Sequence, residues 1–158
     1  MLLPFSAGLI QTGKFDPECA ALADRHYSRQ KVGSPQFAPP GETIILRNAQ
    51  GSVLFVWNRQ LQERADHQEG ANCTIFRNES ERRSSDIILE AERFALARWG
   101  AIRGFTYVDK RAVRSPNPGW CFIAAGWRRA GESASGKLLL EKNLGAAPAT
   151  LPDKEKET

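Results

Sequence analysis

The clearest hydrophobic pattern in the chain lies in residues 84–99, where apolar side chains recur at three- and four-residue intervals. They are Ile87, Ile88, Ala91, Phe94, Ala95 and Trp99. This spacing predicts a helix with one face against a core, and Gly100 suits the position after a helix. Ser84 or Ser85 is expected to cap the helix at its N-terminus.

Strand patterns surround this helix. Residues 43–47 and 52–58 are β-branched and apolar, and the Asn-Ala-Gln-Gly segment between them predicts a hairpin turn. Shorter apolar runs predict further strands at residues 73–76, 104–109 and 137–142.

The sequence predicts two more helices. Residues 16–27 begin with Asp16 as a cap and Pro17 at the first helical position, and a short helix is expected from about residue 120 to Gly126. The resulting order predicts one α/β domain over residues 1–144, with a mixed, mostly antiparallel central sheet flanked by helices. Residues 145–158 are expected to form a disordered tail.

Composition narrows the class of protein. The chain has 158 residues, enough for one domain with a real core, and no apolar run approaches the ~20 residues that span a bilayer. The first residues lack the basic segment of a signal peptide, so a cytoplasmic location without membrane contact is expected. Cys19, Cys73 and Cys121 are far apart, which disfavours a disulfide framework or a metal site.

Positive charge is concentrated in one part of the chain. The net charge is +4, and residues 77–129 hold eleven basic against six acidic residues, whereas the segments before and after are neutral or slightly acidic. Such a surplus suits an anionic partner, either a nucleotide cofactor or nucleic acid. A solvated basic surface is the alternative.

The basic segment opens with a turn between a predicted strand and the helix at residues 84–99. The turn contains three arginines and two serines that are candidates to hold phosphate: Arg77, Arg82, Arg83, Ser84 and Ser85. Helix N-termini present unpaired N–H groups and partial positive charge, and arginines add charge-assisted hydrogen bonds to phosphate oxygens.

This order of elements resembles the GNAT fold of acyl-CoA-dependent acetyltransferases. The resemblance covers residues 43–142 and rests on the strand–turn–helix unit, on the strand at residues 104–109, and on the stretch NPGWCFIAAGW, with Asn117 and the Gly126-Trp127 pair. It implies that acetyl-CoA, or a related acyl-CoA, places its diphosphate at the turn and that Asn117 contacts its pantetheine arm or the substrate. The turn has serines where the family has glycines.

A narrower resemblance is to the phage Mom-type DNA-modification proteins. It is carried by the order of His26-Tyr27-Ser28, the arginine-rich turn, Asp109 at a strand end, and the Ala-Gly-Trp segment. Those GNAT-like enzymes convert adenine in DNA to an N6-carbamoylmethyl derivative that protects phage DNA from restriction. The resemblance implies an enzyme of this kind, with DNA as its substrate.

Four residues are candidates for the chemistry. His26 is a candidate general base, or a residue that only ends a helix, and Tyr27 can stack on a base or pack on the sheet. Asp109 can orient an amine or take its proton, or form a salt bridge with the basic residues after it. Asn117 is a candidate cofactor or substrate contact, or an ordinary turn residue.

If DNA is the substrate, seven basic residues are candidate phosphate contacts: Lys31, Arg103, Lys110, Arg111, Arg114, Arg128 and Arg129. The four tryptophans are candidates to include a base-stacking platform. Two other functions stay open: an ordinary N-acetyltransferase for a small amine or a protein, and a non-catalytic nucleic-acid-binding module, which the missing glycines favour. A homodimer is a further expectation.

Overall fold

The protein is built on one seven-stranded sheet. The structure is a computed structural model that describes residues 8–26, 31–112 and 117–146. The strands are β1 (Leu9–Thr12), β2 (Glu42–Asn48), β3 (Val53–Arg59), β4 (Ala71–Asn78), β5 (Ile102–Val108), β6 (Arg128–Glu132) and β7 (Leu138–Leu144), and the helices are α1 (Pro17–Asp24), α2 (Ser84–Trp99) and α3 (Trp120–Ala124). The spatial order is β1-β2-β3-β4-β5-β7-β6, and every neighbouring pair is antiparallel except β4–β5. The predicted mixed, mostly antiparallel sheet with helices is confirmed.

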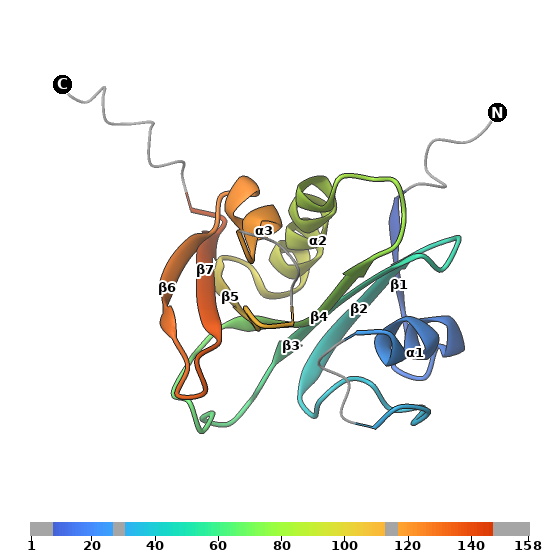
Figure 1. Cartoon of the computed structure of the whole chain (residues 1–158), viewed down its shortest axis with the longest axis horizontal. Helices are drawn as coiled ribbons and strands as arrows, with labels where there is room; N and C mark the ends of the chain where they lie inside the picture. The colour runs from blue at the N-terminus through green and yellow to red at the C-terminus, as the bar shows by residue number, and fades with distance from the viewer. Residues whose placement is uncertain (1–7, 27–30, 113–116, 147–158) are drawn as a thin grey trace.

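Helices cover both faces of the sheet. Figure 1 shows α2 and α3 on one side and α1 on the other. On the first side, Ile87 and Ala91 of α2 pack with Phe55 and Trp57 of β3, as the apolar stripe predicts. Trp57 is fully buried, and its indole donates to the Ala91 carbonyl (2.9 Å), so it belongs to the core.

The opposite face has a second, smaller core. Leu22 of α1 packs over Leu54 and Val56 of β3, and Phe37 from the loop after α1 joins the cluster. The Asn58 amide also donates to the Pro40 carbonyl of that loop (2.9 Å). The proline-rich loop is therefore packed onto the sheet over its later half.

Three details differ from the sequence predictions. The edge strands β1 and β6 were not predicted; β6 is exposed along its whole length, so it has no apolar alternation to signal it. The prediction that Ser84 or Ser85 caps α2 is wrong, because Arg83 holds the cap position and makes no side-chain capping bond. Helix α1 ends at Asp24, earlier than expected. Most of the predicted tail, residues 147–158, lies outside the described residues.

A buried charged group joins α2 to the far strands. One oxygen of Glu92 accepts from the Trp127 indole (2.9 Å), and the other pairs with the Lys142 ammonium (2.8 Å), which also donates to the Ala125 carbonyl (2.8 Å). Glu92 is 7% exposed, so the carboxylate is stabilised by these partners rather than by water. In the part of the chain that the structure describes, no helix is long and apolar enough to cross a membrane.

Candidate functional site

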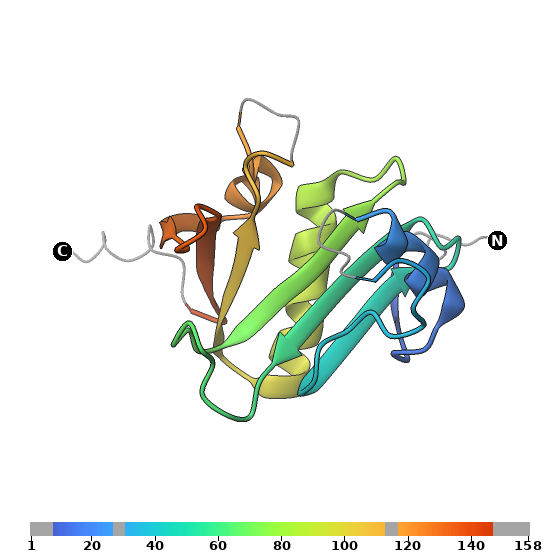
Figure 2. The same ribbon diagram turned by 60° about the horizontal axis from the view of Figure 1, so that its bottom comes forward.

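The single parallel pair of strands opens into a gap. Strands β4 and β5 are paired only between Ala71–Cys73 and Gly104–Thr106, where the Thr106 hydroxyl donates to the Cys73 carbonyl (2.8 Å). Beyond this point β4 stays paired with β3, and β5 stays paired with β7. Figure 2 shows the two strands diverging toward the end where α2 begins and α3 lies. Among the described residues, the part of β4 that follows Cys73 has no strand partner on the side that faces β5.

An irregularity in β4 lies where the gap begins. Trp57 pairs with Cys73 and Val56 with Ile75, which leaves Thr74 as an extra residue in a β-bulge. Bulges bend and twist a strand, and this one directs β4 away from β5. The buried Thr74 hydroxyl has no hydrogen-bond partner among the described residues.

A pocket of about 140 Å³ occupies the gap. Strands β4 and β5, helix α3 with the residue before it, and the turn after α1 line it through nine residues: His26, Cys73, Phe76, Thr106, Tyr107, Val108, Gly119, Cys121 and Phe122. None of these nine carries a carboxylate, an ammonium or a guanidinium group. The pocket therefore suits an uncharged group with apolar or aromatic surface.

His26 is held at this pocket by a cluster of charged residues that we call the clasp: Arg25, Arg77 and Glu79. The Glu79 carboxylate accepts two bonds from Arg25 (2.7 and 3.0 Å) and one from Arg77 (2.7 Å), and Arg77 also donates to the Arg25 carbonyl (2.6 Å). These bonds hold the pKa of Glu79 at about 2. Because Arg25 directly precedes His26, the clasp fastens the end of α1 to the end of β4.

The His26 ring is neutral at physiological pH. Burial lowers its pKa to about 4, with the charge of Arg77 acting in the same direction and a hydrogen bond to the Phe76 backbone opposing both. A neutral imidazole can accept a proton, so the geometry is compatible with the predicted role as a base.

The two thiols of the pocket remain protonated. Burial raises the pKa of Cys73 and also that of Cys121. The nucleophilic form of cysteine is the thiolate, so neither residue is prepared to form a covalent intermediate.

The turn before α2 is organised by Asn78, which the sequence analysis missed. The Asn78 amide donates to the Arg82 carbonyl (2.8 Å) and to the Ser84 hydroxyl (3.0 Å), and its oxygen accepts from the backbone and hydroxyl of Ser80 (2.9 and 2.6 Å). An asparagine at a strand end followed two residues later by serine is typical of such a turn, and that signal was available.

Only part of the predicted phosphate cluster faces outward. Arg77 belongs to the clasp, and Arg82 forms an ion pair with Glu90 (2.9 Å). Arg83 is exposed and makes no ion pair with any residue that the structure describes. Ser84 accepts from Asn78, and Ser85 is buried. Phosphate binding at this turn stays a prediction, and Arg83 is the arginine best placed for it.

The other predicted catalytic residues lie beside the pocket or outside the described chain. Asp109 follows Val108, and its carboxylate accepts from the Arg111 backbone (3.0 Å). Asn117 is exposed, and its backbone carbonyl accepts from the Trp120 backbone (3.0 Å), three residues further along the chain. Tyr27 is outside the described residues. The structure thus places His26 in the wall of the pocket, with Asp109 next to the lining residue Val108 and Asn117 two residues before the lining residue Gly119.

The predicted DNA contacts divide into two groups. Three of them are paired: Arg103 with Glu141 (2.8 Å), Lys110 with Glu132 (2.7 Å), and Arg128 with Glu141. Lys31, Arg111 and Arg129 are exposed, with no ion pair among the described residues, and Arg114 lies outside them. A carboxylate that already holds a guanidinium competes with phosphate, so the second group is the stronger set of candidates.

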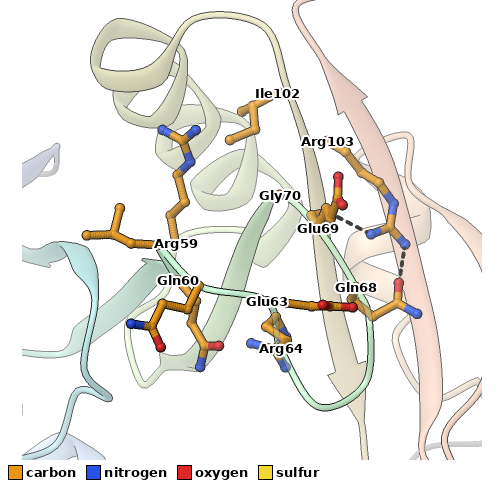
Figure 3. Close-up of a pocket in the computed structure, with 11 residues that line it drawn as sticks. Arg59, Gln60, Glu63, Arg64, Gln68, Glu69, Gly70, Ile102 and Arg103 are labelled. Carbon is orange, nitrogen blue, oxygen red and sulfur yellow. Dashed lines mark hydrogen bonds between the residues drawn. The ribbon is translucent and has the colours of Figure 1, made fainter.

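A larger concavity of about 700 Å³ lies at the opposite end of β4 and β5 (Figure 3). Its polar groups bind one another: Arg103 donates to the Gln68 side chain (2.8 Å) and to the Glu69 carbonyl (2.9 Å), and Arg64 pairs with Asp66 (2.8 Å). These bonds anchor the loop before β4, and none of the predicted catalytic residues lines the concavity. We therefore place the candidate site in the smaller pocket.

The described residues contain no group of three or more His, Cys, Asp or Glu side chains arranged to hold a metal ion. Comparison with protein-family models, with curated proteins and with solved structures gave no match to this chain. The functional argument therefore rests on the site itself.

Proposed function

We propose that this protein is a GNAT-like transferase of the phage DNA-modification type, which transfers a group from an acyl-CoA to the exocyclic nitrogen of adenine in DNA. The observation that carries the proposal is the uncharged pocket between the diverging strands, with the neutral His26 ring in its wall.

The missing charges favour a nucleobase over an aliphatic amine. Lysine-like amines are ammonium ions near neutral pH, and a site for them needs a carboxylate to bind the cation. The lining residues of this pocket offer none, and Arg77 beside His26 adds positive potential. A planar, uncharged amino group fits these surroundings, and Phe76, Tyr107 and Phe122 offer aromatic surface to it.

The donor has a matching place at the same end of the sheet. The open edge of β4 above Cys73 leaves backbone groups that can pair with the amides of an extended pantetheine arm. The first turn of α2, which has no side-chain cap, and the exposed Arg83 provide N–H groups and charge for a diphosphate. An acyl thioester bound there supplies an electrophilic carbonyl.

The residues of the pocket suit direct transfer. The adenine nitrogen forms the new C–N bond, the C–S bond breaks, and the nitrogen's proton passes to His26 while the departing thiolate takes up a proton. An aromatic amine becomes strongly acidic as it attacks, so a base with a pKa of about 4 is sufficient. Asp109 follows the lining residue Val108, but its carboxylate accepts from the Arg111 backbone and does not line the pocket, so we assign it no step in the transfer. The protonated thiols of Cys73 and Cys121 argue against a covalent relay.

One observation favours the non-catalytic alternative. The turn before α2 has no glycine, and Arg82 is held by Glu90, so less of the turn is available to a diphosphate than the sequence suggested. A non-catalytic nucleic-acid-binding module would need the exposed basic residues but no binding site for an acyl-CoA donor.

An acceptor assay tests the proposal. Thiol release from acetyl-CoA, and from other acyl-CoA donors, is measured with an adenine-containing single-stranded oligonucleotide, the same length of oligothymidine, and spermidine. We expect turnover with the first acceptor alone. Turnover with spermidine and none with DNA would indicate an ordinary N-acetyltransferase, and DNA binding without turnover would indicate the module.

Arginine substitutions test the donor site. Arg83→Ala is expected to weaken CoA binding by about tenfold or more, because it removes a charge-assisted contact to phosphate. Arg82→Ala should have a smaller effect, since that guanidinium already pairs with Glu90. The shift in melting temperature on adding CoA measures both, and Arg93→Ala on the exposed side of α2 is the control. Equal CoA affinity in wild type and Arg83→Ala would exclude this place for the diphosphate.

A further inference from the structure

The four tryptophans have different environments. Trp57 and Trp127 are buried, and Trp99 is half-buried with its indole donating to Glu42 (3.2 Å). Trp120 is 61% exposed. Of the four indoles, Trp120 is therefore the one that presents most of its surface to a partner from solution.

The position of Trp120 is more informative than its exposure. It is the first residue of α3, and the residues on either side of it, Gly119 and Cys121, both line the pocket. Figure 2 shows α3 beside the end of β5 where the gap between β4 and β5 is open. Single exposed apolar side chains are common, but this one adjoins the rim of the candidate site.

Two exposed arginines lie at that end of the sheet, and the exposed Glu81 and Asp86 flank one of them, Arg83, in the chain. Arg111 follows β5 and Arg83 precedes α2; both are exposed, and neither has an ion pair among the residues described. An exposed indole at the same end of the sheet as cationic side chains is a combination that suits single-stranded nucleic acid, since bases stack on the aromatic ring and phosphates bind the charges. An apolar protein partner would not require the cations.

We infer that Trp120 stacks on a base next to the one that enters the pocket, so that the substrate is a polynucleotide and not a free nucleoside. The inference rests on the proposed function for the base in the pocket. It adds that a neighbouring nucleotide is held outside the pocket, where it fixes the strand while its neighbour is inserted. A stacked flanking base also helps to keep a flipped-out base from returning to the duplex.

Binding to two oligonucleotides separates stacking from charge. One is a labelled single strand of mixed sequence, and the other has the same length and backbone but abasic sites. We expect Trp120→Ala to bind the mixed strand about tenfold more weakly than the wild type and the abasic strand equally well, with Trp120→Phe retaining most of the affinity. Phe15→Ala, which removes an exposed aromatic ring beside the edge strand β1, should change neither.

Several outcomes would overturn the inference. They are equal binding of the mixed strand by Trp120→Ala and wild type, an equal loss for both strands, or no binding of either strand by the wild type. Self-association of the wild type that Trp120→Ala abolishes would assign the indole to a contact between two copies.

Modification of DNA is measured separately. If Trp120→Ala loses base-dependent binding but the wild type never modifies DNA, the stacking role of Trp120 is supported and the proposed reaction is wrong. If Trp120→Ala modifies DNA as well as the wild type does, the inference alone fails.

Discussion

Glu92→Leu is expected to destabilise the folded protein by about 3 kcal/mol, a large part of the stability of a domain of this size. The substitution removes the carboxylate that holds both Lys142 and the Trp127 indole, and it leaves their polar groups inside the core without that partner. Urea unfolding monitored by circular dichroism measures the change. The Lys142 side chain is 25% exposed and can turn partly toward water, which is why we expect less than the full cost of an isolated buried charge.

Two further variants separate the charge pair from its surroundings. The double variant Glu92→Leu/Lys142→Met should recover part of the loss, because it replaces both charges by apolar groups. Glu132→Ala breaks the exposed pair with Lys110 and should cost less than about 1 kcal/mol. Equal free energies of unfolding for Glu92→Leu and Glu132→Ala would show that the buried pair has no special role.

His26→Ala is expected to lower the transfer rate by about 10²- to 10⁴-fold, the usual contribution of a general base. In the wild type, the acidic limb of the pH–rate profile should lie near the His26 pKa of about 4, because burial keeps the ring neutral above that pH. For the same reason, the contribution of His26 to stability falls as pH decreases from about 6.5 toward 4 and is constant below that, since the unfolded chain binds the proton first.

The clasp provides a second way to disturb His26. Glu79→Gln removes the carboxylate that joins Arg25 to Arg77, so the end of α1 should move away from β4 and the ring should become more hydrated. We expect a smaller loss of rate than for His26→Ala, with the acidic limb shifted upward toward pH 6.5. An acidic limb near 6.5 in the wild type, or a His26→Ala rate equal to wild type, would contradict the role assigned to His26.

Local patterns predicted most of the elements that form the two cores, but not β1, whose Leu9 belongs to the larger core. The spacing of Ile87, Ile88 and Ala91 defined α2, and the Asn-Ala-Gln-Gly turn defined the β2–β3 hairpin. Strand β6 could not be found this way, because none of its residues is buried and its pairing with β7 is its main constraint. The gap between β4 and β5 also depends on pairing between distant segments, which no local pattern reports.

The predicted site residues stay predictions, and the structure shows where their side chains lie. His26 lines the pocket, whereas the guanidiniums of Arg77 and Arg103 are held by carboxylates that the sequence did not connect with them. Arg103 and Glu141 are 38 residues apart and meet only because β5 pairs with β7. The surplus of basic residues in the sequence therefore does not tell which of these side chains are already paired with carboxylates and which are available to a ligand.

Nucleoside mass spectrometry of DNA tests the central claim most directly. The protein and its His26→Ala variant are expressed in bacteria that lack related enzymes, and the DNA is digested to nucleosides. The proposed function predicts deoxyadenosine with added mass in cells that express the wild type, and a large reduction of that product in cells that express His26→Ala. Unmodified deoxyadenosine in cells that contain the folded wild-type protein would contradict it.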